Sequence, residues 1–314
     1  MSYAFVFPGQ GAQVVGMGAA LADAFPAARE VFQEVDEALG QHLFRLMVEG
    51  PESDLTLTEN TEPALMTVSM AIVRVLQAEG GIALARTGRY VAGHSLGEYT
   101  ALCAAGAITL PDCARLLRLR GRAMQAAVPV GEGAMAAILG LDFAAVAAIA
   151  SQAAEREVCA AANDNAPGQV VVSGHAAAVE RAIALAKEQG AKRAILLSVS
   201  APFHCPLMAP AAEAMAEALA GAEIAPPDPA LIANVTARPV EDPVEIRDLL
   251  VRQVTGAVRW RESIEFLRDQ EIETIAELGV GGVLSGLTRR IDRSLNGRAV
   301  STPEEIGALI ADLA

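Results

Sequence analysis

The segment Gly93-His94-Ser95-Leu96-Gly97 could carry nucleophilic chemistry, because it has the pattern G-x-S-x-G. An apolar stretch precedes it and a helix-forming run follows, as expected for a serine on a sharp strand-to-helix turn that exposes its Oγ. The glycines permit backbone angles and close approaches that a Cβ would obstruct. N–H groups at the start of the helix would face any oxyanion formed nearby. Ser95 is therefore the candidate nucleophile, and acyl transfer the candidate chemistry.

A serine nucleophile needs a base, and the sequence offers four histidines, which are His42, His94, His175 and His204. His94 adjoins Ser95, so the turn should point its ring away, which favours a packing role. His42 and His175 are most simply surface residues. His204 lies in a loop fixed between two prolines, which would hold its ring in place. By elimination, His204 is the expected base.

A second loop, Gly9-Gln10-Gly11, follows a short apolar strand. It resembles a phosphate-binding glycine loop, but G-x-G-x-x-G fails because Val14 occupies the last position. Gln10 could instead supply a donor beside Ser95, as an oxyanion hole requires. A plain turn is an equally good interpretation of these residues.

Arginines alternate with apolar residues from Leu117 to Arg122, so at least one arginine should face inward. The planar guanidinium of Arg120 could bind a carboxylate through two parallel hydrogen bonds, which a lysine cannot reproduce. The alternative is a surface salt bridge to one of the many acidic residues.

Short strands alternate with helices over much of the chain, which indicates a parallel α/β sheet. The expected strands cover residues 4–7, 90–92, 230–234 and 274–277. The expected helices cover residues 17–39, 61–79, 96–105, 111–127, 207–220, 246–252 and 263–269. The helix over 61–79 would begin at Thr61 with Pro63 in its first turn.

The middle of the chain has a different order, β-α-β-β-α-β, which is typical of a ferredoxin-like unit. Its expected strands are 133–140, 158–162, 169–173 and 193–198, its helices 143–154 and 177–189, and a turn is expected over 163–168. The predicted fold is α/β, with a parallel-sheet, α/β-hydrolase-like large subdomain (1–127 and 200–314) and an inserted ferredoxin-like small subdomain (128–199).

Composition narrows the class of protein. The 314 residues are 53% hydrophobic and 20% charged, which suits a well-buried globular chain. The net charge of −14 disfavours nucleic acid and anionic membranes as partners. No apolar run is long enough to span a bilayer and no leader is evident, so we expect a soluble cytoplasmic protein. The four cysteines are scattered, which indicates buried thiols rather than disulfides or a metal site.

Five motifs in order resemble the malonyl-CoA:acyl carrier protein transacylases of fatty-acid synthesis, of the discrete bacterial type. They are Phe7-Pro8-Gly9-Gln10-Gly11-Ala12-Gln13, Gly93-His94-Ser95-Leu96-Gly97-Glu98-Tyr99, Arg120-Gly121-Arg122-Ala123-Met124-Gln125, Asn165-Ala166-Pro167-Gly168-Gln169 and Phe203-His204-Cys205. The acyltransferase domains of polyketide synthases are similar as well. The match is collinear over nearly the whole chain, which makes it far more specific than any single motif.

The resemblance implies that Ser95 becomes malonylated while His204 accepts its proton. It implies an oxyanion hole formed by the backbone N–H groups of Gln10 and Leu96. It also implies malonyl-CoA and holo acyl carrier protein as partners, no cofactor and no metal, and a monomer.

Further roles follow from the same resemblance. Arg120 would bind the free malonyl carboxylate, and an unpaired buried charge there would select against acetyl groups. The backbone carbonyl of Gln253 would orient the histidine in place of a triad aspartate. Asn163 and Asn165 would lie at the cleft between the subdomains. Phe203 stands where some bacterial relatives have serine, and its ring would fill the space of an α-methyl group, which predicts malonyl rather than methylmalonyl preference.

Other functions fit some of the same residues. A polyketide-type discrete acyltransferase fits the same motifs. A serine esterase or thioesterase of the α/β-hydrolase type also uses G-x-S-x-G, but its histidine lies near the C-terminus, and here no histidine follows His204. A patatin-like hydrolase would carry an Asp-Gly pair, which the sequence lacks. A non-catalytic carrier-binding protein would need neither Ser95 nor Arg120.

Overall fold

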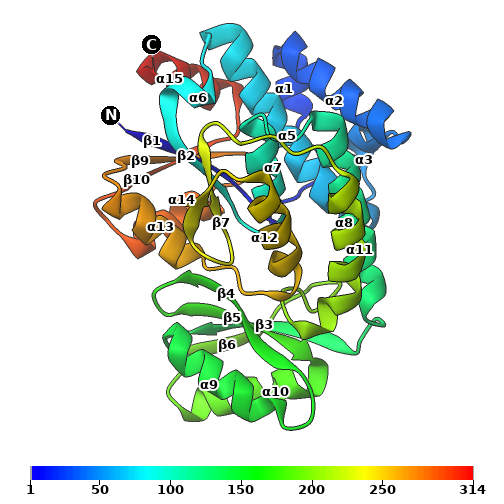
Figure 1. The fold of residues 1–314 in the computed structure, drawn as a ribbon, viewed down its shortest axis with the longest axis vertical. Helices are drawn as coiled ribbons and strands as arrows, with labels where there is room; N and C mark the ends of the chain where they lie inside the picture. Colours follow the sequence, from blue (N-terminus) through cyan, green and yellow to red (C-terminus); the bar gives the residue numbers. More distant parts are fainter. Residues whose placement is uncertain (1, 314) are drawn as a thin grey trace.

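The structure is a computed structural model that describes residues 2–313, and these residues form two separate β-sheets (Figure 1). The larger sheet has the strand order β10-β9-β1-β2-β7-β8, and the smaller has the order β4-β5-β3-β6. The strands of the larger sheet are β1 (Tyr3–Phe7), β2 (Gly88–Gly93), β7 (Ala230–Ala233), β8 (Arg238–Val240), β9 (Thr274–Leu278) and β10 (Asn296–Val300). The predicted fold class, α/β with a parallel sheet and a separate second unit, is confirmed.

The larger sheet is parallel except for β8, which pairs antiparallel with β7 at one edge. β1 is buried along its whole length, as expected for a short apolar strand covered on both faces. Phe7, at the carboxyl end of β1, pairs with Gly93 at the carboxyl end of β2. The loop after β1 and the turn after β2 therefore leave the same edge of the sheet, which brings Gln10 and Ser95 to one site.

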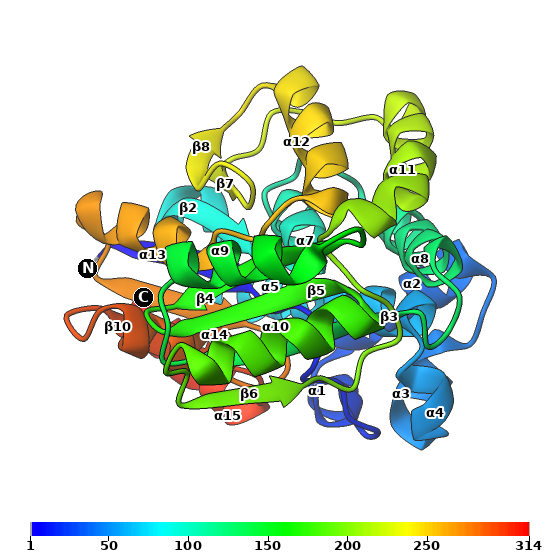
Figure 2. The same ribbon diagram turned by 90° about the horizontal axis from the view of Figure 1, so that it is seen from below.

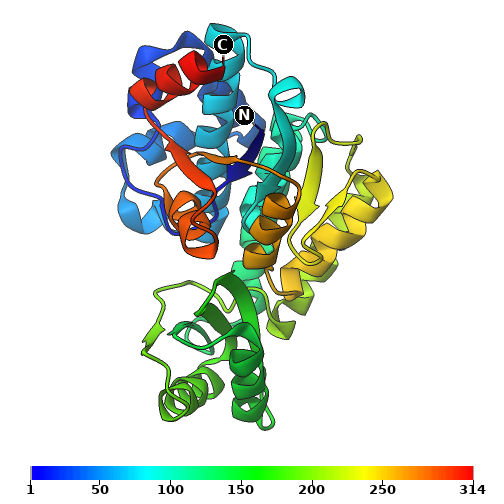
Figure 3. The same cartoon turned by 90° about the vertical axis from the view of Figure 1, so that its left-hand side faces the viewer.

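Helices cover both faces of this sheet (Figures 1 and 3). One face is covered by α1 (Ala19–Ala24), α2 (Pro26–Leu39), α3 (Leu43–Glu49), α4 (Glu52–Leu55), α5 (Thr58–Gly80), α6 (Leu84–Thr87), α7 (Leu96–Ala104), α8 (Leu110–Ala127), α11 (Ala209–Gly221), α12 (Pro243–Thr255) and α15 (Pro303–Leu313). The other is covered by α13 (Trp260–Asp269) and α14 (Val283–Ile291). Side chains alternate along β1 accordingly: Phe5 and Phe7 join the first core, Ala4 and Val6 the second.

The smaller sheet is antiparallel throughout. Its elements are β3 (Gly133–Leu139), α9 (Phe143–Ala154), β4 (Cys159–Ala166), β5 (Gln169–His175), α10 (Ala176–Glu188) and β6 (Arg193–Leu196). Figure 2 shows α9 and α10 lying along one face of this sheet, where Ala136 and Ile138 of β3 join their core. Met135 and Val171 belong to a separate cluster and line a cavity. The division of the chain at residues 128 and 199 stays a prediction.

The two units are joined by backbone pairing as well as by the chain. The N–H of Asp164 in β4 donates to the carbonyl of Val258 at 2.9 Å, and the N–H of Val258 donates to Ala162 at 2.9 Å. Arg261 of α13 adds an ion pair to the buried carboxylate of Asp164 at 2.8 Å. These contacts attach β4 of the smaller sheet to the segment around the start of α13.

Two predicted elements were wrong in detail. The helix expected over 17–39 is two helices, α1 and α2, because Phe25 precedes Pro26 and is extended (φ −129°, ψ 119°). The turn expected over 163–168 is confined to its last residues, because β4 continues to Ala166. Pairing of β4 with β5 and with Val258 outweighs the turn preference of its asparagines.

Other elements were predicted imperfectly or missed. α5 begins at Thr58, three residues before Thr61, whose hydroxyl donates to the carbonyl of Leu55. The elements absent from the prediction are α3, α4, α6, β8, α14, β10 and α15. All four cysteines are free and buried, as predicted. Within residues 2–313, no helix is long and apolar enough to cross a membrane.

Candidate active site

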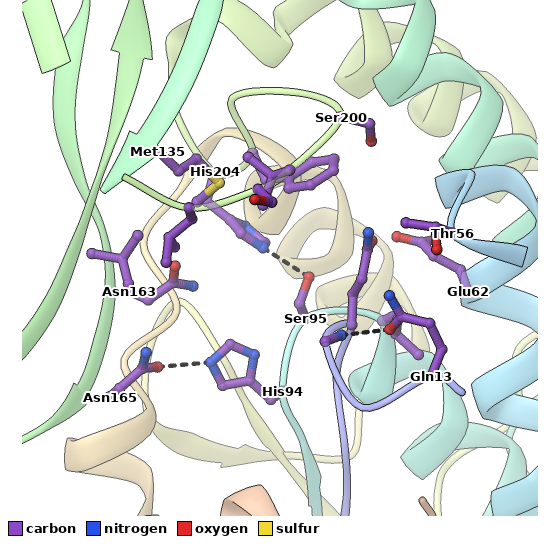
Figure 4. Close-up of a pocket in the computed structure, with 18 of the residues that line it drawn as sticks. Gln13, Thr56, Glu62, His94, Ser95, Met135, Asn163, Asn165, Ser200 and His204 are labelled. Atoms are coloured by element: carbon purple, nitrogen blue, oxygen red, sulfur yellow. Dashed lines mark hydrogen bonds between the residues drawn. The ribbon is translucent and has the colours of Figure 1, made fainter. Parts of the chain in front are cut away.

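A cavity of about 530 Å³ is lined by residues of both units (Figure 4). Of the site residues predicted from the sequence, Gln253 does not line the cavity. The predicted residues that do line it are Gln10, Ser95, Leu96, Arg120, Asn163, Asn165 and His204. His42 and His175 do not line it. His42 is an exposed side chain, whereas His175 is half-buried and its Nδ1 accepts from the N–H of Val158.

Ser95 and His204 face each other in the cavity, with Ser95 Oγ 2.7 Å from His204 Nε2 (Figure 4). Ser95 lies between β2 and α7 with φ 55°, a conformation that costs a non-glycine residue free energy. His204 also has a positive φ of 59°. Both strained residues meet at one hydrogen bond, as expected where the surrounding structure holds a reactive pair in place.

The imidazole of His204 is held from its other side by Gln253 on α12. Its Nδ1 lies 2.8 Å from the backbone carbonyl of Gln253. Because a carbonyl can only accept, Nδ1 carries the proton and Nε2 accepts from the serine hydroxyl. Burial, followed by the charge of Arg120, lowers the pKa of His204 from 6.5 to about 3. The ring is therefore neutral at neutral pH and free to take a proton.

The sharp turn brings backbone groups very close together. A Cβ on Gly97 would lie 2.2 Å from the carbonyl oxygen of Phe7, and one on Gly93 would lie 1.8 Å from that of Gly97. Only glycine fits at either position. The loop after β1 is thereby packed against the start of α7, with Gln10 and Leu96 lining the same cavity. Neither of their backbone N–H groups donates to a protein acceptor within residues 2–313.

Arg120 is completely buried beside the nucleophile. Its Nη2 donates to Ser95 Oγ at 3.1 Å and to the side-chain oxygen of Gln253 at 2.9 Å, and its Nη1 forms an ion pair with Glu62 of α5. The expectation of an unpaired buried charge at Arg120 is wrong, because Glu62 neutralises it. Arg120 lines the cavity, and its role in binding a carboxylate stays a prediction.

Sequence reasoning missed a buried polar network under the turn. The side-chain amide of Gln253 donates to the carbonyl of Ser95 and to the carboxylate of Glu98, both at 2.8 Å. Asn234 accepts from the N–H of Ser95 at 2.8 Å and donates to the carbonyl of Gly93 at 2.6 Å. These side chains therefore fix the backbone of the turn at Gly93 and Ser95. Burial raises the pKa of Glu98 from 4.5 to about 7, against the lowering effect of the Gln253 bond.

The asparagines predicted at the cleft come from β4 and also line the cavity (Figure 4). Asn165 Oδ1 lies 2.9 Å from Nε2 of His94, and Asn163 is buried beside it in the strand. His94 follows β2 and packs 5.7 Å from the ring of Trp260. Burial lowers the pKa of His94, so this ring also stays neutral. His94 lines the cavity but bonds to Asn165, which agrees with the packing role expected for it.

Glu62 could have been found in the sequence by one feature. It is the only charged residue between Glu59 and Arg74, in a stretch whose other residues are uncharged and mostly apolar. A buried carboxylate within an apolar helix requires a cationic partner or a proton. The arginine-rich segment 115–122 was the obvious source of that partner.

Comparisons with known proteins agree with this geometry. The family described as "Acyl transferase domain" matches residues 4–312. The chain is 47% identical over 308 residues to the Malonyl CoA-acyl carrier protein transacylase of Escherichia coli (strain K12), covering 98% of each protein. It is 54% identical to the acyl-carrier-protein-S-malonyltransferase crystal structure from Bartonella henselae, with a TM-score of 0.97 and coverage of 100% of this chain and 99% of that one.

A further solved structure contains a partner. It is a holo type II PKS acyl-carrier protein in complex with its malonyl-transacylase, 43% identical to this chain with a TM-score of 0.96, and the match covers 99% of this chain and 100% of that one. These similarities extend over both sheets and the cavity between them.

Proposed function

The chain belongs to the acyl transferase domain family, and from this premise we propose that it transfers the malonyl group of malonyl-CoA to the phosphopantetheine thiol of an acyl carrier protein. The observation that carries the proposal is the position of Arg120, whose Nη2 lies 3.1 Å from the Oγ of Ser95. A short acyl group with a terminal carboxylate can present its thioester carbonyl to Ser95 and its carboxylate to the guanidinium.

In the first half of the reaction, Ser95 Oγ attacks the thioester carbonyl of malonyl-CoA. His204 Nε2, already 2.7 Å away, takes the hydroxyl proton. The carbonyl of Gln253 keeps the other ring nitrogen protonated, so the base has the right tautomer at the start. The C–S bond then breaks, and the thiolate of coenzyme A leaves with the proton from His204.

The negative charge of the tetrahedral intermediate needs donors in the same cavity. We propose the backbone N–H groups of Gln10, in the loop after β1, and of Leu96, the first residue of α7. Neither group has a protein acceptor within residues 2–313. In the second half, the carrier thiol gives its proton to His204 and attacks the serine ester through the same donors. Ser95 recovers its proton as the malonyl thioester departs.

The malonyl carrier thioester is the building block of fatty-acid synthesis, and this is the pathway proposed for the chain. A discrete polyketide-type acyltransferase is the second candidate, because a malonyl-transacylase bound to a type II PKS acyl-carrier protein is among the similar structures. Malonyl-CoA and holo acyl carrier protein are the proposed partners in both cases. The monomeric state stays a prediction, as does the absence of a cofactor.

Intact-protein mass measurement after mixing with malonyl-CoA or acetyl-CoA tests the proposal. A malonyl adduct is expected on the wild-type chain and none on Ser95→Ala. The adduct should shift from malonyl toward acetyl in Arg120→Ala. Addition of holo carrier should move the malonyl group to the carrier rather than to water. Absence of any adduct and of any malonyl carrier would refute the transfer, whereas free malonate alone would indicate a hydrolase.

A further inference from the structure

Glu62 and Arg120 form an ion pair, and both residues line the cavity where the acyl group must bind. Both side chains are almost fully buried, with exposed fractions of 3% and 1%. Both also line the cavity, so the pair is part of the acyl-binding wall. An acyl carboxylate that binds Arg120 must therefore approach a carboxylate that is already there.

The free pair has unsatisfied hydrogen-bonding capacity. Glu62 Oε1 faces Arg120 Nη1, but Glu62 Oε2 has no hydrogen-bond partner within residues 2–313, and neither does Arg120 Nε. Both atoms are buried, and buried polar atoms without a partner are costly, so the protein alone does not satisfy the hydrogen-bonding capacity of the pair. A carboxylate ligand could accept from the guanidinium, but the carboxyl group of Glu62 can lie beside that ligand favourably only if it carries a proton.

Two carboxylates cannot share one guanidinium in a dry cavity and both stay ionised, because their mutual repulsion and desolvation are uncompensated. We propose that Glu62 is a specificity-determining residue that must be protonated for a carboxylated acyl group to bind, so that malonyl transfer is coupled to uptake of one proton. This inference rests on the proposed malonyl transfer and adds a condition to it.

The proton balance is simple. Above pH 7, the free site holds Arg120 as a cation and Glu62 as an anion. When the malonyl group enters, its carboxylate pairs with Arg120, and one proton from the solvent binds the carboxylate of Glu62, which becomes neutral. When the malonyl group leaves on the carrier thiol, Glu62 releases that proton and pairs with Arg120 again. An acetyl group has no carboxylate and requires no such proton.

The site favours this exchange. Burial raises the pKa of Glu62 from 4.5 to about 7, even though Arg120 acts in the opposite direction, so protonation near neutral pH is accessible. The other groups around the pair are Glu98 and Tyr99 on α7 and His204 on the loop before α11. His204 is neutral, and burial raises the pKa of Tyr99, which keeps its phenol neutral. Glu98 does not line the cavity and is bonded to Gln253.

The test is the ratio of kcat/KM for malonyl-CoA to kcat/KM for acetyl-CoA between pH 6 and pH 9. Titration of His204 and of the thiols acts on both substrates and cancels in the ratio. For the wild type, the ratio should fall about tenfold per pH unit above pH 7, because only the protonated fraction of Glu62 accepts malonyl. Glu62→Gln, which cannot ionise, should make the ratio independent of pH.

The matched control is Glu59→Gln. Glu59 also lies on α5 and also pairs with an arginine of α8, Arg122, but it is outside the cavity. The ratio in this variant should keep the wild-type pH dependence. Glu98→Gln should keep it too. If the ratio loses its pH dependence in Glu98→Gln and keeps it in Glu62→Gln, the proton binds Glu98 rather than Glu62, and the inference is overturned.

A second measurement needs no variant, in case Glu62→Gln does not fold. Wild-type protein in weakly buffered solution at pH 8 is mixed with each ester, and proton uptake is followed with an indicator dye. Malonylation should take up close to one proton more per serine than acetylation. Equal uptake, with a malonyl adduct on Ser95 confirmed by mass, would overturn the coupling and leave the transfer intact. Absence of the adduct would instead refute the proposed function.

Discussion

The carbonyl oxygen of Gln253 lies 2.8 Å from Nδ1 of His204, in the position that a carboxylate occupies in a serine-histidine-aspartate triad. A carbonyl fixes the tautomer of the ring as well as a carboxylate does. It carries no net charge, however, and so stabilises the protonated imidazole less. Burial is the main cause that lowers the pKa of His204 to about 3, and the charge of Arg120 is the second, against the raising effect of the Gln253 bond.

This low pKa predicts an unusual acid limb of the pH profile. Because His204 loses its basicity only when protonated, kcat/KM for serine acylation should stay constant from pH 6.5 down to about pH 5. The measurement is single-turnover release of coenzyme A from malonyl-CoA. His204→Ala, as the reference for loss of the base, should slow acylation by about 10²- to 10⁴-fold. A fall centred near pH 6.5 in the wild type would contradict the low pKa.

Phe203 predicts the choice between malonyl and methylmalonyl groups. Its ring lines the cavity next to His204 and packs partly against the core. If the ring fills the space of an α-methyl group, Phe203→Ala should raise kcat/KM for methylmalonyl-CoA by roughly tenfold or more, the usual value of one methyl group in an apolar pocket. The value of kcat/KM for malonyl-CoA with the same variant corrects for any loss of activity that is not specific to the α-methyl group. Equal rates of the wild type with both esters would rule the role out.

Much of the site could be predicted from local sequence. Ser95 follows from the glycine spacing, and His204 follows from the scarcity of histidines. The side-chain role of Gln253 could not be predicted, because its partners Ser95, Glu98 and Arg120 are between 133 and 158 residues away. Contacts of that range depend on how β2, α8 and α12 pack, and no local pattern encodes them.

The fold shows the same limit. α9 was predicted with its observed bounds, and the structure shows that its start is set locally, because the side chain of Asp142 accepts from the N–H of Ala145. β10, in contrast, has the sequence Asn-Gly-Arg-Ala-Val, which has little intrinsic strand preference. It is a strand because it pairs in parallel with β9 along its whole length.

The Glu62–Arg120 pair predicts coupled effects on stability. Arg120→Ala leaves a buried carboxylate without its cation, which should lower the free energy of unfolding by about 3–5 kcal/mol at pH 8. Adding Glu62→Gln removes the unpaired charge, so the double variant should recover part of that loss. Urea unfolding of the wild type, both single variants and the double variant measures the coupling. Strictly additive losses would show that the two side chains do not interact.

Glu98 predicts a pH dependence of stability. Its pKa is about 7 in the folded protein and about 4.5 when unfolded. The folded state therefore binds the proton more tightly than the unfolded state. The resulting contribution of Glu98 to the free energy of unfolding is fully present below pH 4.5 and is lost as the pH rises through 7. Relative to the wild type, Glu98→Gln should gain about 1–3 kcal/mol between pH 5 and pH 8. Urea unfolding at both pH values tests this. A pH-independent difference between the two proteins would contradict it.

Glycine-to-alanine substitutions should have opposite effects on stability at Gly97, in the turn, and at Gly286, an exposed position on a helix. Gly97→Ala would place a Cβ 2.2 Å from the carbonyl oxygen of Phe7, and because the obstacle is backbone, no side-chain rotation relieves it. We expect the unfolding free energy to fall by more than about 3 kcal/mol, or the chain not to fold. Gly286→Ala in α14 is the control, because a Cβ there meets no atom within 4 Å.

In the control, the alanine should raise stability by about 0.5–1 kcal/mol, since it removes chain freedom from the unfolded state and favours the helix. Thermal unfolding of both variants, with malonyl adduct formation on Ser95 as the functional measurement, separates the two sites. Comparable stability and adduct formation in both variants would mean that β1 and α7 can move apart. Ser95 would then not depend on that close approach for its position beside Gln10.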